Sequence, residues 1–97
     1  MDESTVRDRA EAHGKATVAG DLRVAGSDLT KEAMVQAGDV MKAMPDPLES
    51  SEVTSVQADG DEFVAQIRYA GAGAETVVES RWADRDGTPK IVSLKVL

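Results

Sequence analysis

The chain has 97 residues and a mass of 10.3 kDa, which is enough for one small domain. Its 18 acidic and 11 basic residues give a net charge of −7, which argues against binding to nucleic acid or to an anionic membrane surface. The absence of cysteine excludes disulfides and thiol chemistry, and the single histidine excludes a metal site built from several histidines. Without a long apolar run we expect neither a membrane span nor a signal peptide, and so a cytoplasmic protein, with no cofactor implied by any motif.

The first element that the sequence predicts is a helix over residues 4–19. Thr5 is placed to cap its N-terminus, and Gly20 follows its end. With a rotation of about 100° per residue, one stripe of this helix is turned to the interior. The stripe consists of Val6, Ala10, His13 and Thr17. His13 should therefore face the rest of the fold and not bulk water.

Two further helices are expected, over residues 22–26 and 30–44. Asp21 can cap the shorter helix, and Thr30 can cap the longer one, which Pro45 ends. The longer helix carries an apolar arc formed by Ala33, Met34, Ala37, Val40, Met41 and Met44. Such an arc is typical of simple core packing. Because methionine side chains adapt to many shapes, the wall of a ligand pocket is the alternative.

Beyond Pro45 and Pro47 the pattern changes to short β-branched runs separated by glycine-containing turns. It predicts four strands, over residues 51–58, 62–70, 75–83 and 90–97. The dipeptide Asp59-Gly60 is a strong hairpin signal between the first two strands. Helices followed by consecutive strands predict an α+β fold, with the N-terminal helices packed on a four-stranded antiparallel sheet.

The register of the central hairpin follows from the number of loop residues, odd or even, and from the alternation of side chains along each strand. If the connection at 71–74 leaves an even number of loop residues, Phe63 faces Trp82, and Tyr69 lies on the same face of the sheet. This face would be the inner one, because most of the charge of the hairpin falls on the reverse face. Across Asp59-Gly60, the same reasoning places Val56 beside Phe63 and Thr54 beside Ala65.

For the last hairpin we expect an odd loop around Asp86-Gly87, with a bulge as the alternative. It would bring three branched side chains onto the inner face beside Trp82, Ser80 and Val78, namely Val92, Leu94 and Val96, and each contributes about 1.5–3 kcal/mol on burial. Ile91 and Leu97 would then join Val64 and Val77 on the reverse face. That semi-apolar patch predicts a homodimer formed through the sheet.

The chain resembles small members of the nuclear transport factor 2-like superfamily, which is also called SnoaL-like or cystatin-like α+β. The resemblance rests on the N-terminal helix leading to Gly20-Asp21-Leu22 and on the closing stretch RWADRDGTPKIVSL at residues 81–94. It implies a curved, cone-like sheet around the first helix, whose inside often holds a small apolar ligand. The superfamily includes isomerases, dehydratases, cyclases and non-enzymatic modules, and this chain is too short for the cover that deepens the pocket in the enzymes.

Two polar residues are the weak catalytic candidates, His13 and Tyr69. The pocket is expected to be lined by His13, Met34, Met41, Phe63, Tyr69 and Trp82. No acidic residue occupies an inward position of the central hairpin, so the set of groups needed for catalysis is incomplete. We therefore expect a non-enzymatic, dimeric domain that binds a small apolar ligand. The alternatives are a small isomerase or dehydratase that uses His13 and Tyr69, and a pure dimerisation or protein-interaction module.

Overall fold

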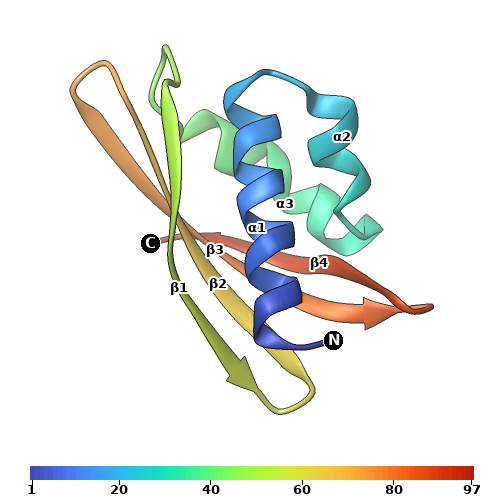
Figure 1. Ribbon diagram of the computed structural model, residues 1–97. Coiled ribbons are helices and arrows are strands. Elements are labelled where there is room, and N and C mark those ends of the chain that lie inside the picture. The colour runs from blue at the N-terminus through green and yellow to red at the C-terminus, as the bar shows by residue number, and fades with distance from the viewer.

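The computed structural model describes residues 1–97 as three helices packed on one side of an open, four-stranded antiparallel sheet (Figure 1). The elements in chain order are α1 (Glu3–Val18), α2 (Leu22–Ser27), α3 (Lys31–Lys42), β1 (Ser50–Asp59), β2 (Glu62–Gly71), β3 (Ala74–Arg85) and β4 (Thr88–Val96). The strands lie side by side in the order of the chain. The predicted α+β class is confirmed, and the element bounds differ from the predicted ones by at most two residues. No helix is both long enough and apolar enough to cross a lipid bilayer.

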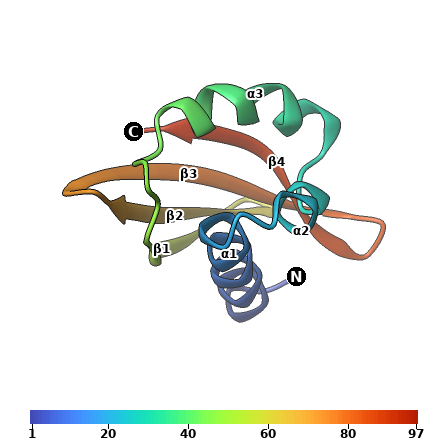
Figure 2. The same ribbon diagram turned by 90° about the horizontal axis from the view of Figure 1, so that it is seen from above.

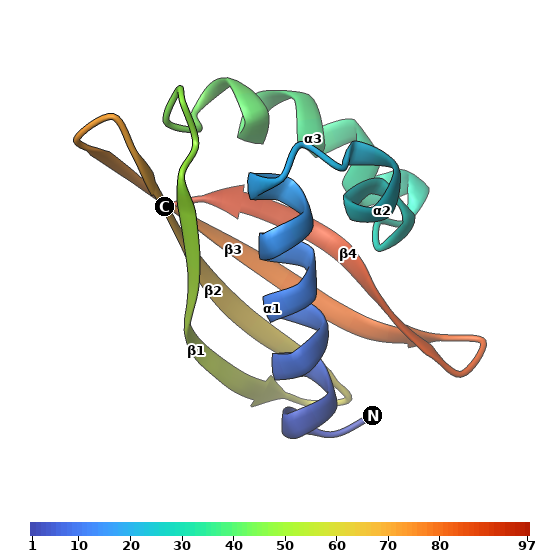
Figure 3. The same ribbon diagram turned by 45° about the horizontal axis from the view of Figure 1, so that its top comes forward.

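The helices cover different parts of the sheet. The sheet curves around α1, which packs mainly on β1, whereas α3 runs along β4 (Figures 2 and 3). Two backbone hydrogen bonds tie the segment between α2 and α3 to β4: Ile91 N donates to Asp28 O (2.7 Å), and Thr30 N donates to Ile91 O (2.9 Å). Gln36 of α3 accepts a hydrogen bond from Leu94 N at 2.7 Å. Part of the outer edge of β4 is thereby occupied.

Side-chain caps explain where the helices begin. Asp21 and Thr30 cap α2 and α3, as the sequence predicts. For α1 the prediction is wrong, because Asp2 and not Thr5 is the cap. The Asp2 carboxylate accepts a hydrogen bond from Thr5 N at 2.8 Å, and a negative charge at this position also interacts favourably with the helix dipole.

The register of β2 and β3 is the predicted one, with Phe63 opposite Trp82 and Tyr69 opposite Thr76. The turn between β1 and β2 is shifted by one residue. Asp59 pairs with Glu62, because Gly60 takes the first loop position with a φ of +64°.

Two predicted neighbours across this turn are therefore wrong. Val56 lies opposite Ala65 and not opposite Phe63. Thr54 falls at a β-bulge between Val53 and Ser55, so it has no partner in the register. The bulge changes the register and brings Val53 opposite Ile67 on the inner face.

The odd loop predicted between β3 and β4 is also wrong. Arg85 pairs with Thr88 around a two-residue loop, Asp86-Gly87, in which both residues have positive φ, as a type I′ turn requires. A bulge then absorbs Val92, so that Trp82 pairs with Ile91 while Arg81 pairs with Ser93. The bulge places Ile91 on the inner face together with Leu94 and Val96, and Ile91 is fully buried instead of facing outward.

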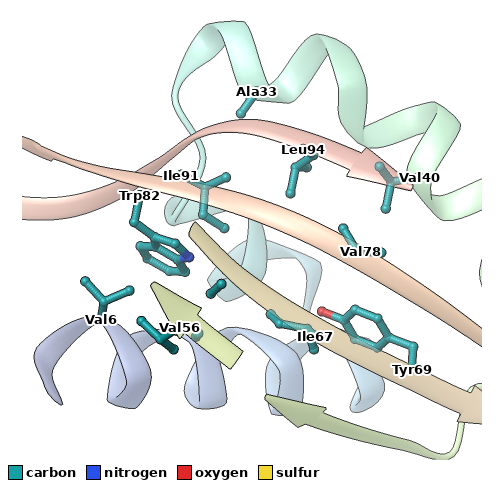
Figure 4. Close-up of a cluster of buried hydrophobic side chains, with 12 residues drawn as sticks. Val6, Ala33, Val40, Val56, Ile67, Tyr69, Val78, Trp82, Ile91 and Leu94 are labelled. Atoms are coloured by element: carbon teal, nitrogen blue, oxygen red, sulfur yellow. The ribbon is translucent and has the colours of Figure 1, made fainter. Parts of the chain in front are cut away.

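The hydrophobic core lies between α1, the sheet and α3. Trp82 lies with Val6 and Val56 at one end of this core, and Tyr69 and Val78 lie toward the other end (Figure 4). Buried polar atoms in the core are paired: the Trp82 indole Nε1 donates to Ser80 Oγ (3.0 Å), and Ser80 Oγ donates to Ala65 O (3.1 Å). Ser80 therefore has a structural role.

Candidate functional site

A cavity of about 230 Å³ lies between the three helices and the inner face of the sheet. Its wall contains no Asp, Glu, Lys or Arg side chain and is mainly apolar. The helices and the segments that follow α2 and α3 contribute His13, Thr17, Leu22, Ala25, Gly26, Leu29, Met34, Ala37, Gly38, Val40, Met41 and Met44, and the sheet contributes Tyr69, Val78 and Leu94. The cavity is thus an apolar space with a few polar groups, which is the usual composition of a small-molecule site.

His13 is the main polar group of this wall. It comes from the buried stripe of α1, its residue is only 8% exposed, and its ring meets the Trp82 ring edge-to-face at a centroid distance of 6.3 Å. The His13 Nδ1 atom lies 3.0 Å from Asp28 Oδ2. Because an ionised carboxylate only accepts hydrogen bonds, Asp28 orients the ring with a proton on Nδ1.

The central hairpin supplies no acid to the inner face, and the acid that contacts His13 comes instead from the end of α2. Asp28 is the C-cap residue of α2 and lies outside the periodic part of both neighbouring helices, and its backbone oxygen accepts a hydrogen bond from Ile91 N of β4. Helical and strand periodicity give no signal for such a residue. The only sequence signal is a polar residue at the break between two capped helices.

The second ring nitrogen of His13 has no partner in the protein. Only Nδ1 takes part in a hydrogen bond. The structure leaves no buried side-chain nitrogen or oxygen without a partner, so Nε2 must have accessible surface. His13 lines the cavity, and Nε2 is its only ring nitrogen without a partner in the protein.

Tyr69 and Thr17 are the other polar residues of the wall. The Thr17 hydroxyl donates to His13 O at 2.9 Å, one turn back along α1. Burial raises the pKa of the Tyr69 phenol above its ordinary value, and the neighbouring Thr17 side chain opposes part of this increase. Tyr69 is therefore a neutral hydrogen-bond donor throughout the physiological pH range.

We expect the Tyr69 phenol to titrate above the ordinary value of 10.0 in the folded protein, because burial disfavours the phenolate. Tyr69 is the only tyrosine, so the ultraviolet absorbance of phenolate against pH reports this group alone. The far-ultraviolet circular dichroism must show that the fold persists over the titration. Tyr69→Phe should abolish the absorbance change, and a midpoint at the ordinary value would show that water reaches the phenol.

The structure places only part of the predicted pocket lining at the cavity. His13, Met34, Met41 and Tyr69 line it, whereas Phe63 and Trp82 do not. Phe63 is near the turn after β1, and Trp82 is fully buried in the core. Both share the inner face with Tyr69, but the N-terminal half of α1 fills the space above that part of the sheet.

Comparison of the chain with protein-family models, with curated proteins and with solved structures gives no match. No group of three or more His, Asp or Glu side chains comes together in a way that could hold a metal ion. The chemistry of the site is therefore that of one histidine, oriented by an acid, and one phenol at an apolar cavity.

Proposed function

We propose that the protein binds a small, uncharged and mostly apolar molecule in the cavity between its helices and its sheet. The observation that carries this proposal is the wall of the cavity, which is apolar apart from a few uncharged polar side chains and His13. A charged ligand would lose its hydration there without gaining a partner of opposite charge. An apolar cavity of about 150 Å³ holds benzene, so about 230 Å³ suits a molecule of one or two rings.

The mouth of the cavity supports access from solvent. Leu22, Met34 and Met41 line the cavity and are also 58%, 49% and 43% exposed. Large apolar side chains at this level of exposure are typical of a binding surface. Unbranched methionine side chains can change rotamer at low cost, so they can admit a ligand and then close against it.

The methionine methyl groups give a direct test with naphthalene as the probe. Three of the four methionines, Met34, Met41 and Met44, line the cavity, and Met1 does not. In a protein labelled with carbon-13 at these methyl groups, we expect naphthalene to shift the three cavity signals in a saturable way. The Met1 signal serves as an internal control and should stay in place.

A variant that fills the cavity provides the matched control. Gly38 lies inside α3 and lines the cavity, and a Cβ atom added there meets no other atom within 4 Å. Gly38→Leu should keep the fold, because leucine favours helix by up to about 1 kcal/mol over glycine, and should abolish the naphthalene shifts. Unchanged methionine signals in the parent protein, or equal shifts in both proteins, would contradict binding in this cavity.

Catalysis by His13 is the second candidate function, and the Asp28 contact favours it. An imidazole held by a carboxylate at Nδ1 can accept a proton at Nε2, and the Tyr69 phenol can donate one. This pairing suits an isomerase or a dehydratase. Binding remains the first candidate because it requires only the cavity and its wall, whereas catalysis also requires a substrate placed between the two groups.

We also infer membership in the nuclear transport factor 2-like superfamily. The order of the elements supports it, with three helices before four antiparallel strands. Further support comes from the position of α1 against the curved sheet (Figure 3). The cavity at the end of the sheet that α2 and α3 cover also supports it.

Association of two copies through the reverse face of the sheet has less support than ligand binding. Ile91, expected in this patch, is buried on the inner face, which leaves Val64, Val77 and Leu97. Two arginines on the reverse face form ion pairs, Arg68 with Glu52 and Glu75, and Arg81 with Asp59 and Glu62. We keep homodimerisation as a secondary proposal, since these charges would have to be desolvated in such an interface.

A further inference from the structure

We propose that the ligand carries a hydroxyl group, as an alcohol or a phenol, which donates a hydrogen bond to Nε2 of His13. This inference rests on the proposed function, because it requires that the cavity binds a small molecule. It adds the chemical class of the ligand, which cavity volume and apolarity alone leave open.

The contact with Asp28 sets what His13 can recognise. The Asp28 carboxylate is 3.0 Å from Nδ1 and can only accept, so the ring proton resides on Nδ1. In the neutral imidazole, Nε2 is then a lone-pair acceptor. A ligand that satisfies Nε2 must bring a hydrogen-bond donor.

The acceptor is held in place before any ligand arrives. Asp28 O accepts from Ile91 N, and Lys90 Nζ donates to Ser27 O at 2.6 Å, so the backbone around Asp28 is fixed on β4. His13 is packed against Trp82. A rigid acceptor in an apolar wall discriminates strongly, because a ligand without a donor would cover that atom and leave it unpaired.

The class of donor follows from the rest of the wall. An ammonium donor would be a buried cation, and no acidic side chain lines the cavity to pair with it. A hydroxyl is an uncharged donor, and its oxygen remains free to accept a hydrogen bond from Tyr69, the phenol on the same wall. An ether oxygen can also accept a hydrogen bond from Tyr69. Only an alcohol or a phenol can in addition donate a hydrogen bond to His13, so this second bond distinguishes these ligands from ethers.

Three bicyclic probes test the proposal on the parent protein: 2-naphthol, 2-methoxynaphthalene and naphthalene, with dissociation constants taken from the methionine methyl shifts. We expect 2-naphthol to bind at least tenfold more tightly than 2-methoxynaphthalene at neutral pH. Equal affinities for these two probes would overturn the hydroxyl proposal and leave the proposed function intact. Failure of all three probes to shift the signals would instead overturn the proposed function.

Asp28→Asn tests the role of the ring proton. The asparagine amide can donate to Nδ1, which moves the ring proton to Nε2 and removes the acceptor. The advantage of 2-naphthol should fall below threefold, while naphthalene binds as before. A merely structural role of Asp28 would weaken all three probes together and would contradict the proposal. Asp21→Asn is the matched control, since Asp21 is exposed and asparagine also caps helices.

A measurement on the unmodified protein covers the case in which Asp28→Asn does not fold. His13 is the only histidine, so the nitrogen-15 spectrum of its ring contains two signals that report the tautomer directly. We expect the neutral ring to be protonated at Nδ1, and the Nε2 signal to shift on addition of 2-naphthol. Protonation at Nε2 in the neutral ring would overturn the proposal.

Discussion

Trp82→Ala is expected to remove about 3–5 kcal/mol from the free energy of unfolding. The side chain is fully buried and is the largest in the core of a chain with only three aromatic residues. Its removal leaves a cavity between α1 and β4 and also deletes the hydrogen bond from Nε1 to Ser80 Oγ. A domain of this size has a total stability of about 5–15 kcal/mol, so the loss is a large fraction of it and would leave a domain near the lower end of this range largely unfolded.

Urea denaturation followed by far-ultraviolet circular dichroism measures this loss, because the substitution also removes the only tryptophan fluorescence. Trp82→Phe is the matched control: it keeps an aromatic ring in the core and loses the indole N–H, so it should cost distinctly less. If Trp82→Ala changed stability by less than 1 kcal/mol and only weakened naphthalene binding, the residue would belong to the wall of the site and not to the core.

The central hairpin shows what the sequence alone can predict. An even loop and side-chain alternation are sufficient to place Phe63 opposite Trp82, because a shift by one residue would turn the whole apolar face to solvent. The last hairpin shows the limit of this reasoning. An odd loop and a bulge both bring Leu94 and Val96 onto the inner face, and we expect the odd loop, whereas the structure combines the even loop with a bulge at Val92 and buries both Ile91 and Leu94. Side-chain alternation alone does not decide between an odd loop and a bulge.

The candidate site likewise contains one residue that the sequence predicts and one that it does not. The helical stripe places His13 toward the interior, and the structure agrees. The sequence does not predict the position of Asp28, because that position depends on a backbone hydrogen bond with Ile91, which is far away in the sequence. The sequence also places Trp82 at the pocket, because side-chain alternation predicts the face of the sheet on which a residue lies and not its position along the strand. The part of the inner face that borders the cavity depends on where α1 packs on the sheet.

Gly71→Ala is expected to cost about 3 kcal/mol or more, for a reason that lies in the backbone. A Cβ atom at this position would lie 2.1 Å from Pro47 O and 3.0 Å from Glu49 N. Both are backbone atoms of the segment that leads into β1, so no side-chain rotation can relieve the clash. The segment would have to move and would lose the hydrogen bond from Glu49 N to Ala70 O, now 2.9 Å long.

Gly73→Ala, two residues further along the same turn, is the matched control. Gly73 has a φ of +76°, and a Cβ atom there meets nothing within 4 Å, so alanine should cost only about 1–2 kcal/mol of backbone strain. Gly71 has no positive φ, so the loss of stability in Gly71→Ala comes only from the clash of the added Cβ atom with the segment before β1. Equal losses of stability in the two variants would show that the segment before β1 can move away freely. A larger loss for Gly71→Ala, measured by the same urea denaturation, is the result expected if that segment is packed tightly on β2.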